Sequence, residues 1–151
     1  MGPETLKVNE VYNRKITLFR DLLECVTLER ENLINLDIKA LWDLMLKKQK
    51  IMEDIENTAS RLRELINERD LYHHLPSEDR RHFMELSQKL LELKENIRTR
   101  VLENISFIRD SLAFFHDIIS MFASSKDTDE PYSPGSKKMK NGPRHLYQNE
   151  A

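Results

Sequence analysis

The sequence predicts an all-α protein, a long antiparallel helical bundle or coiled coil of about three helices with a disordered C-terminal tail. Between Glu4 and Glu130 the chain has no glycine and one proline, Pro76, whereas sheet proteins need turn residues about every ten positions. Large apolar residues recur there at spacings of three and four, which is the period of a helix. This period ends near Ala123, where prolines and glycines begin to gather.

The first expected helix runs from about Glu4 to Leu36, with one polar step at Arg30 in its apolar stripe. The stripe consists of Val8, Tyr12, Ile16, Phe19, Leu23, Val26 and Leu33. Asn35, Leu36 and Asp37 interrupt the pattern, and the Asp37 carboxylate can accept hydrogen bonds from the free amides of a following helix. We therefore expect a break or kink here.

The second expected helix has an apolar seam in strict alternation of three and four, as in a coiled coil, with one polar step at Lys48. The seam consists of Ile38, Leu41, Met45, Met52, Ile55, Ala59, Leu62 and Ile66. Residues 72–76 end this helix. Ser77 is a suitable N-cap for the next one, and Glu78 and Asp79 favour the positive end of its dipole, so a hairpin turn is expected here.

The third expected helix spans Ser77 to Ala123 and would be about 70 Å long at the helical rise of 1.5 Å per residue. Two successive steps of four between Ile97 and Ile105 predict a stutter, which locally unwinds a supercoil. Its seam reads Phe83, Leu86, Leu90, Leu93, Ile97, Val101, Ile105, Ile108, Leu112, Phe115, Ile119 and Phe122.

The chain divides into an expected helical bundle domain, residues 1–123, and an expected flexible tail, residues 124–151. The tail holds three of the five prolines and two of the three glycines. Its few large apolar residues cannot offset the entropy of ordering the segment. Whether the tail folds when a partner binds is left open.

Charge and cysteine content narrow the class of function. The chain has 24 basic and 26 acidic residues, so no strong positive field is available to bind nucleic acid. Cys25 is the only cysteine, which excludes an intramolecular disulfide and fits a reducing compartment. Neither a signal sequence nor a long apolar run is recognisable. We expect a cytoplasmic protein without stable membrane insertion.

The sequence offers no constellation typical of an enzyme, and we expect neither catalysis nor a cofactor. Glycine-rich phosphate-binding motifs are missing. His73, His74 and His82, with Asp70, could suggest a metal site, but solvated histidines at a helix hairpin are the favoured interpretation because no helical pair of histidines four residues apart exists. Cys25 has apolar neighbours, which favours a structural thiol over a nucleophile.

A second apolar stripe in the last half of the third helix points to binding. It consists of Phe107, Phe114, Ile118 and Met121, with Ser111 in the gap. Two stripes on one helix can both be buried by neighbouring helices of a three-stranded bundle. Alternatively, one stripe stays open and receives an amphipathic helix from another protein.

The segment ERENLINLDIKALWDLMLKKQKIMEDI resembles the pattern of the FlgN-type flagellar export chaperones. The matching positions are Glu29, Leu33, Asp37, Leu41, Leu44, Lys48, Ile51, Met52 and Ile55. The tail residues Tyr132, Ser133, Pro134, Gly135 and Lys137 are similar to the tyrosine and glycine motif that follows the bundle in that family.

The resemblance implies a cytoplasmic chaperone for flagellar type III protein export. Such chaperones bind the C-terminal segments of the hook-filament junction proteins, also called hook-associated proteins, and deliver them to the export gate. The resemblance also implies that Tyr132 contacts that gate. Two alternatives stay open: a structural coiled-coil subunit for oligomerisation, and a chaperone for the filament cap protein. The sequence does not decide which client is bound, nor between a monomer and a homodimer.

Overall fold

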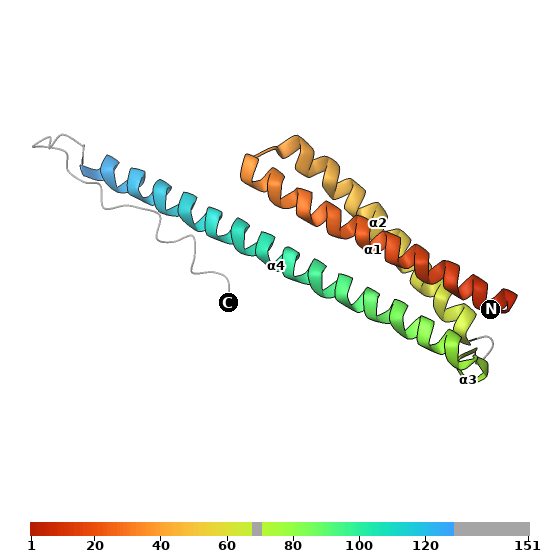
Figure 1. Ribbon diagram of the computed structural model, residues 1–151. Coiled ribbons are helices and arrows are strands. Elements are labelled where there is room, and N and C mark those ends of the chain that lie inside the picture. Colours follow the sequence, from red (N-terminus) through yellow and green to blue (C-terminus); the bar gives the residue numbers. More distant parts are fainter. Residues whose placement is uncertain (68–70, 129–151) are drawn as a thin grey trace, which may run out of the picture. The chain divides into compact units, whose positions relative to one another are not determined.

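The computed structural model describes residues 1–67 and 71–128, and every secondary-structure element in this part of the chain is a helix. The elements are α1 (Pro3–Asn35), α2 (Ile38–Asn67), the short α3 (Leu71–His74) and α4 (Ser77–Thr128) (Figure 1). The all-α helical bundle expected from the sequence is confirmed. The chain forms two compact units, Met1–Leu112 and Ala113–Ala151, which we describe separately.

Helix α4 continues to Thr128, past the expected end at Ala123. Most of the expected tail, including Tyr132, lies outside the described residues. The boundary between bundle and tail and the disorder of the tail therefore stay predictions.

The expected break between the first two helices is confirmed at Leu36, which adopts a left-handed conformation with φ 55° and ψ 34°. The amide of Asp37 donates to the Asn32 carbonyl at 3.0 Å, and the amide of Leu36 donates to the Leu33 carbonyl at 3.3 Å. This is a Schellman ending. Asp37 then caps α2 as expected, because its Oδ1 accepts a hydrogen bond from the amide of Ala40 at 3.0 Å.

Leu36 makes this turn at a conformational cost, since a side chain with a Cβ disfavours positive φ. We expect Leu36→Gly to raise the free energy of unfolding by about 0.5–1 kcal/mol, although it removes a large residue. The matched control is Leu46→Gly, also an exposed leucine but inside α2, which should lower it by about 1 kcal/mol. Urea unfolding followed by circular dichroism measures both, and a loss of stability in both variants would contradict this account.

The main core of the first unit lies where α1, the end of α2 and the start of α4 pack together. The rings of Tyr12 and Phe83 are 5.7 Å apart, and Tyr12 Oη lies 3.4 Å from Ser87 Oγ. His82 Nε2 lies 2.8 Å from Asn9 Oδ1 and fixes the register of α4 on α1. The buried residues of this core are Val8, Val11, Tyr12, Ile16, Leu62, Leu75, Phe83, Leu86 and Leu90.

A second core cluster joins α1 to the first half of α2. Leu18, Cys25 and Ile51 are buried there, and Leu44 packs against them. Cys25 is buried, and this burial raises the pKa of its thiol. Lys48 interrupts the apolar pattern of α2, and its Nζ lies 3.0 Å from the Glu29 carboxylate on α1. This ion pair explains why a lysine is accepted at that position.

The seam predicted for the first half of α2 was wrong. Ile38, Met45 and Met52 are exposed, while Leu44 and Ile51, on a different side of the helix, pack against α1. Both sets have helical spacing, so α2 carries two apolar stripes, and spacing alone did not reveal which one faces α1.

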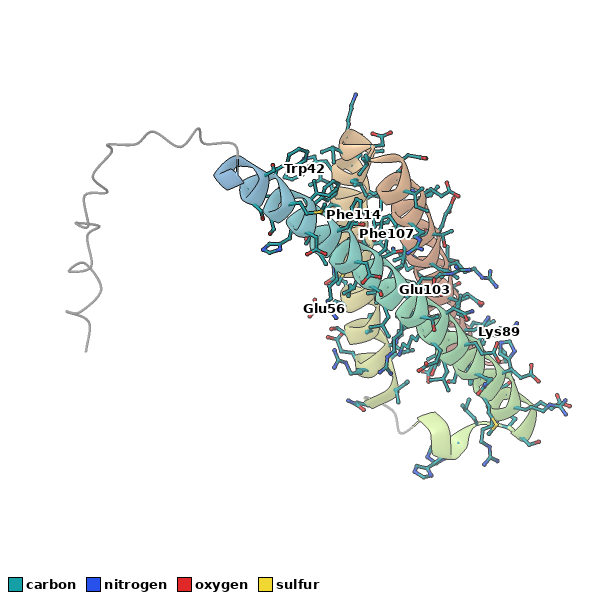
Figure 2. The ribbon with its side chains drawn as sticks, turned by 90° about the vertical axis from the view of Figure 1, so that its left-hand side faces the viewer. Trp42, Glu56, Lys89, Glu103, Phe107 and Phe114 are labelled. Carbon is teal, nitrogen blue, oxygen red and sulfur yellow. The ribbon has the colours of Figure 1, made fainter. Side chains whose placement is uncertain are left out.

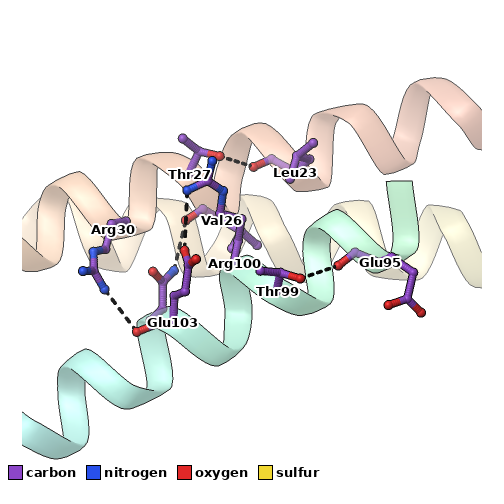
Figure 3. A network of polar contacts seen from close by, with 9 residues as sticks. Leu23, Val26, Thr27, Arg30, Glu95, Thr99, Arg100 and Glu103 are labelled. Atoms are coloured by element: carbon purple, nitrogen blue, oxygen red, sulfur yellow. Dashed lines mark hydrogen bonds and ion pairs between the residues drawn. The ribbon is translucent and has the colours of Figure 1, made fainter. Parts of the chain in front are cut away.

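The seam predicted for α4 was also wrong beyond Val101. In the turn of α4 that follows Val101, the buried residue is Asn104, and its Nδ2 donates a hydrogen bond to the Val26 carbonyl at 3.0 Å. Arg30 Nη1 donates to the Glu103 carbonyl at 3.1 Å, so two polar contacts join α4 to α1 (Figure 3). Ile105, Ile108 and Leu112, which were expected in the seam, are exposed.

Candidate partner-binding surface

In the second unit, the sequence-predicted binding residues lie on the open surface of α4. Phe114 is 62% exposed and Met121 is 71% exposed, while Ile118 between them is half-buried. Among the described residues, Ile118, Met121, Phe122 and Ser125 line a hollow of about 450 Å³. Large apolar side chains around a hollow can receive an apolar side chain of another protein.

The residues assigned to the bundle seam in the same segment are exposed too. Phe115, Ile119 and Phe122 were expected to pack inside the bundle, but each exposes half or more of its surface. They are therefore further candidate binding residues, beyond those that the sequence pattern indicated. Apolar residues at helical spacing can either pack inside a bundle or bind a partner, and the spacing is the same in both cases. Only the observed exposure of these side chains distinguishes packing from a binding surface.

Phe107 belongs to the first unit and has a different environment from the other predicted site residues. It is half-buried, and the guanidinium carbon of Arg30 lies 4.8 Å from the centre of its ring. This cation–π contact helps to hold α4 on α1. Figure 2 shows the side chain of Phe107 on α4 near Glu103, whose carbonyl also binds Arg30. The fifth predicted residue, Tyr132, lies outside the described residues.

The exposed α4 segment has few charged neighbours. Between Ala113 and Ser125 the ionisable residues are His116 and Asp117, which lie 3.9 Å apart and are both largely exposed. A partner would therefore meet a mainly apolar surface in the second unit.

In the first unit, burial lowers the pKa of Lys15, and the positive charges of Lys94 and Arg63 act in the same direction.

Asp70, which was considered as a metal ligand together with His73, His74 and His82, lies outside the described residues. His82 contacts Asn9, and His73 and His74 are exposed near the end of α3. Within residues 1–67 and 71–128, no group of three or more histidine, cysteine or acidic side chains is placed to hold a metal ion. The same part of the chain has no helix that is both long and apolar enough to cross a membrane.

The described residues form a helical bundle whose last helix carries exposed apolar side chains. Its sequence matches the family model described as FlgN protein over residues 1–139. The chain therefore belongs to the FlgN family, a family of flagellar export chaperones rather than of enzymes. No curated protein and no solved structure matches the chain.

Proposed function

We propose that this chain acts in the cytoplasm by binding the C-terminal helices of hook-filament junction proteins and delivering them to the flagellar export gate. One observation carries the proposal: residues 114–122 of α4 keep Phe114, Phe115, Ile119, Met121 and Phe122 exposed. Such a surface suits an amphipathic client helix, which would itself aggregate if left uncovered.

The size of this surface supports a reversible complex. If a client buried four of these large apolar side chains completely, each would contribute about 1.5–3 kcal/mol to the free energy of binding. Loss of translational and rotational freedom on association offsets much of this gain. We therefore expect micromolar binding from these residues, and tighter binding only with further contacts. A reversible complex is what delivery requires, since the client must be released at the export gate.

The proposal is tested by calorimetric titration of the full chain with C-terminal peptides of the two junction proteins. We expect micromolar affinity, weakened about tenfold to a hundredfold by Phe114→Ala combined with Ile118→Ala. The matched control combines Met84→Ala with Leu91→Ala, two exposed apolar residues in the first half of the same helix, and should bind like the original chain.

Three outcomes would overturn the proposal. Equal weakening by the control would show that the segment beyond Leu112 is not the binding surface. Binding of the filament cap protein's C-terminal peptide alone would support the cap chaperone. A stable oligomer that persists on dilution and binds no peptide would support a structural coiled-coil subunit.

A further inference from the structure

The first half of helix α2 exposes a row of large apolar side chains. Each exposes between 43% and 70% of its surface, and Trp42, the only tryptophan of the chain, exposes 62%. Figure 2 shows Trp42 near the start of α2. Because successive residues of a helix turn by about 100°, these side chains lie within an arc of about 120°. We name them the α2 face: Ile38, Trp42, Met45, Leu46 and Met52.

The α2 face points away from the contact with α1. Leu44 and Ile51 of the same half-helix pack on α1. By the same helical geometry, the centre of the α2 face lies roughly 140° around the helix from these two residues. The packing of α1 on α2 therefore leaves the α2 face in solvent. An exposed apolar area of this kind is typical of a surface that binds another protein.

Alternating charges lie along one edge of the α2 face. We name these four exposed residues the charge row: Lys39, Asp43, Lys50 and Glu53. Together with Leu46 they follow one another at spacings of four, three, four and three residues. These spacings place them within an arc of about 80°. The order along this edge is positive, negative, apolar, positive and negative.

The charge row is complementary to itself when two copies of α2 run antiparallel. The same edges of two antiparallel helices then meet across a two-fold axis, so the two charge rows face each other. With the axis beside Leu46, Lys39 of one copy lies opposite Glu53 of the second copy. Asp43 lies within one residue of Lys50 of the second copy, about 1.5 Å along the helix. Each charge of the row therefore meets an opposite charge.

Lys50 is available for this contact although it already pairs with Asp54 in its own helix. The two groups are 3.3 Å apart, and the Lys50 side chain is 72% exposed. An exposed pair of this kind contributes little to stability. A second carboxylate can therefore approach the same ammonium group, which has three donor hydrogens.

The apolar side chains fit the same antiparallel arrangement. About the axis beside Leu46, Met52 of the second copy falls between Ile38 and Trp42 of the first. The contact extends along residues 38–53, which is about 24 Å of helix. Tryptophan is enriched among residues that dominate protein interfaces, and methionine side chains adapt their shape to the partner.

A parallel pair would lack the match of charges. In a parallel arrangement, the charge row of each copy meets the other edge of the α2 face, which holds Met45 and Met52. Charged groups would then lie against apolar side chains, which is costly without a partner of opposite charge. The order of the charges therefore selects the antiparallel direction.

We propose that the α2 face binds a second copy of this chain, with the two α2 helices antiparallel around a two-fold axis beside Leu46. The apolar side chains supply the attraction, and the charge rows set the direction and register. This self-association goes beyond the proposed function, in which the partner is a client helix. About four helical turns from each copy form a smaller interface than permanent dimers have, so the dimer dissociates on dilution.

Sedimentation of the full chain over a series of concentrations measures this self-association. We expect a reversible equilibrium between monomer and dimer with a micromolar dissociation constant. The emission of Trp42 should shift to shorter wavelength over the same concentrations, because its ring leaves water in the dimer. Met45→Glu with Leu46→Glu should weaken the dimer at least about a hundredfold. The control is Lys89→Glu, at an exposed position of α4, which should change little.

An exchange of charges tests the antiparallel register. The acidic variant combines Lys39→Glu with Lys50→Glu, and the basic variant combines Asp43→Lys with Glu53→Lys. Each variant alone should dimerise at least about tenfold more weakly than the original chain, because like charges face each other. A mixture of the two should form a heterodimer at least as tight as the original dimer. Circular dichroism of every variant verifies that the helices are intact.

Three results would overturn the proposal. The first is a chain that stays monomeric at every concentration measured. The second is a failure of the acidic and basic variants to associate when mixed. The third is a dimer that Phe114→Ala with Ile118→Ala abolishes but Met45→Glu with Leu46→Glu preserves, since α4 would then carry the self-association. The titration with junction peptides tests the proposed function separately, because it measures binding of a different partner.

Discussion

Replacing Phe83 with alanine is expected to lower the free energy of unfolding of the first unit by about 3–5 kcal/mol. Phe83 is 2% exposed and lies in the main core, where its ring contacts those of Tyr12 and His82. Its removal leaves a cavity at the point where α1, α2 and α4 meet. Urea unfolding followed by circular dichroism measures the loss.

The matched control for this prediction is Phe122→Ala, the same change on the exposed part of the same helix. It should alter the free energy of unfolding by no more than about 0.5 kcal/mol. A similar loss in the two variants would mean that the end of α4 is as well packed as its start. That result would contradict the exposed surface on which the proposed function rests.

Asn104→Asp is expected to cost about 2–4 kcal/mol at neutral pH. Asn104 is 4% exposed, and its amide donates to the Val26 carbonyl. The new carboxylate cannot donate in its charged form and would face a carbonyl oxygen. The control is Asn96→Asp, at an exposed position of α4, which should cost no more than about 0.5 kcal/mol.

The cost of Asn104→Asp should depend on pH in a defined direction. Burial disfavours the charged carboxylate, so its pKa in the folded state lies above its unfolded value. Stability is then retained below the unfolded pKa, where the protonated acid can donate to Val26, and is lost as pH rises through the folded pKa. Unfolding measured across acidic pH tests this, and a cost that does not change with pH would contradict the buried hydrogen bond.

The helices could be predicted from the sequence because their signals are local. The left-handed turn at Leu36 and the Asp37 cap depend on neighbouring backbone groups, and the expected break was found at this place. Helix α4 begins at Ser77, directly after Pro76, where the sequence predicted that a new helix starts. A long chain segment without glycine leaves few alternatives to helix.

The packing sides of the helices could not be predicted in the same way, because more than one stripe had helical spacing. On α2, Leu44 and Ile51 face α1, whereas Met45 and Met52, with the same spacing, are exposed. On α4, the apolar pattern predicted that Ile105 would be buried and not the neighbouring Asn104. The structure buries Asn104 because the Val26 carbonyl satisfies its amide, a partner 78 residues distant in the chain.

The sequence pattern separated Phe114, Ile118 and Met121 from the expected seam, and their role in binding stays a prediction. Phe115, Ile119 and Phe122, which are exposed, were assigned to packing. Phe107 was grouped with the site by spacing, while its ring contacts Arg30 of α1. Spacing identifies a face of a helix, and only tertiary contacts show whether another element already covers it.

The most direct test of the central claim is site-specific photocrosslinking of the full chain to a hook-filament junction protein. A photoreactive residue is placed at position 114 or 121 of α4, with position 84 of the same helix as the control. The account predicts adducts from positions 114 and 121 that map to the client's C-terminal helix, with none from position 84. Adducts from position 84 alone, or no adduct from any position, would contradict it.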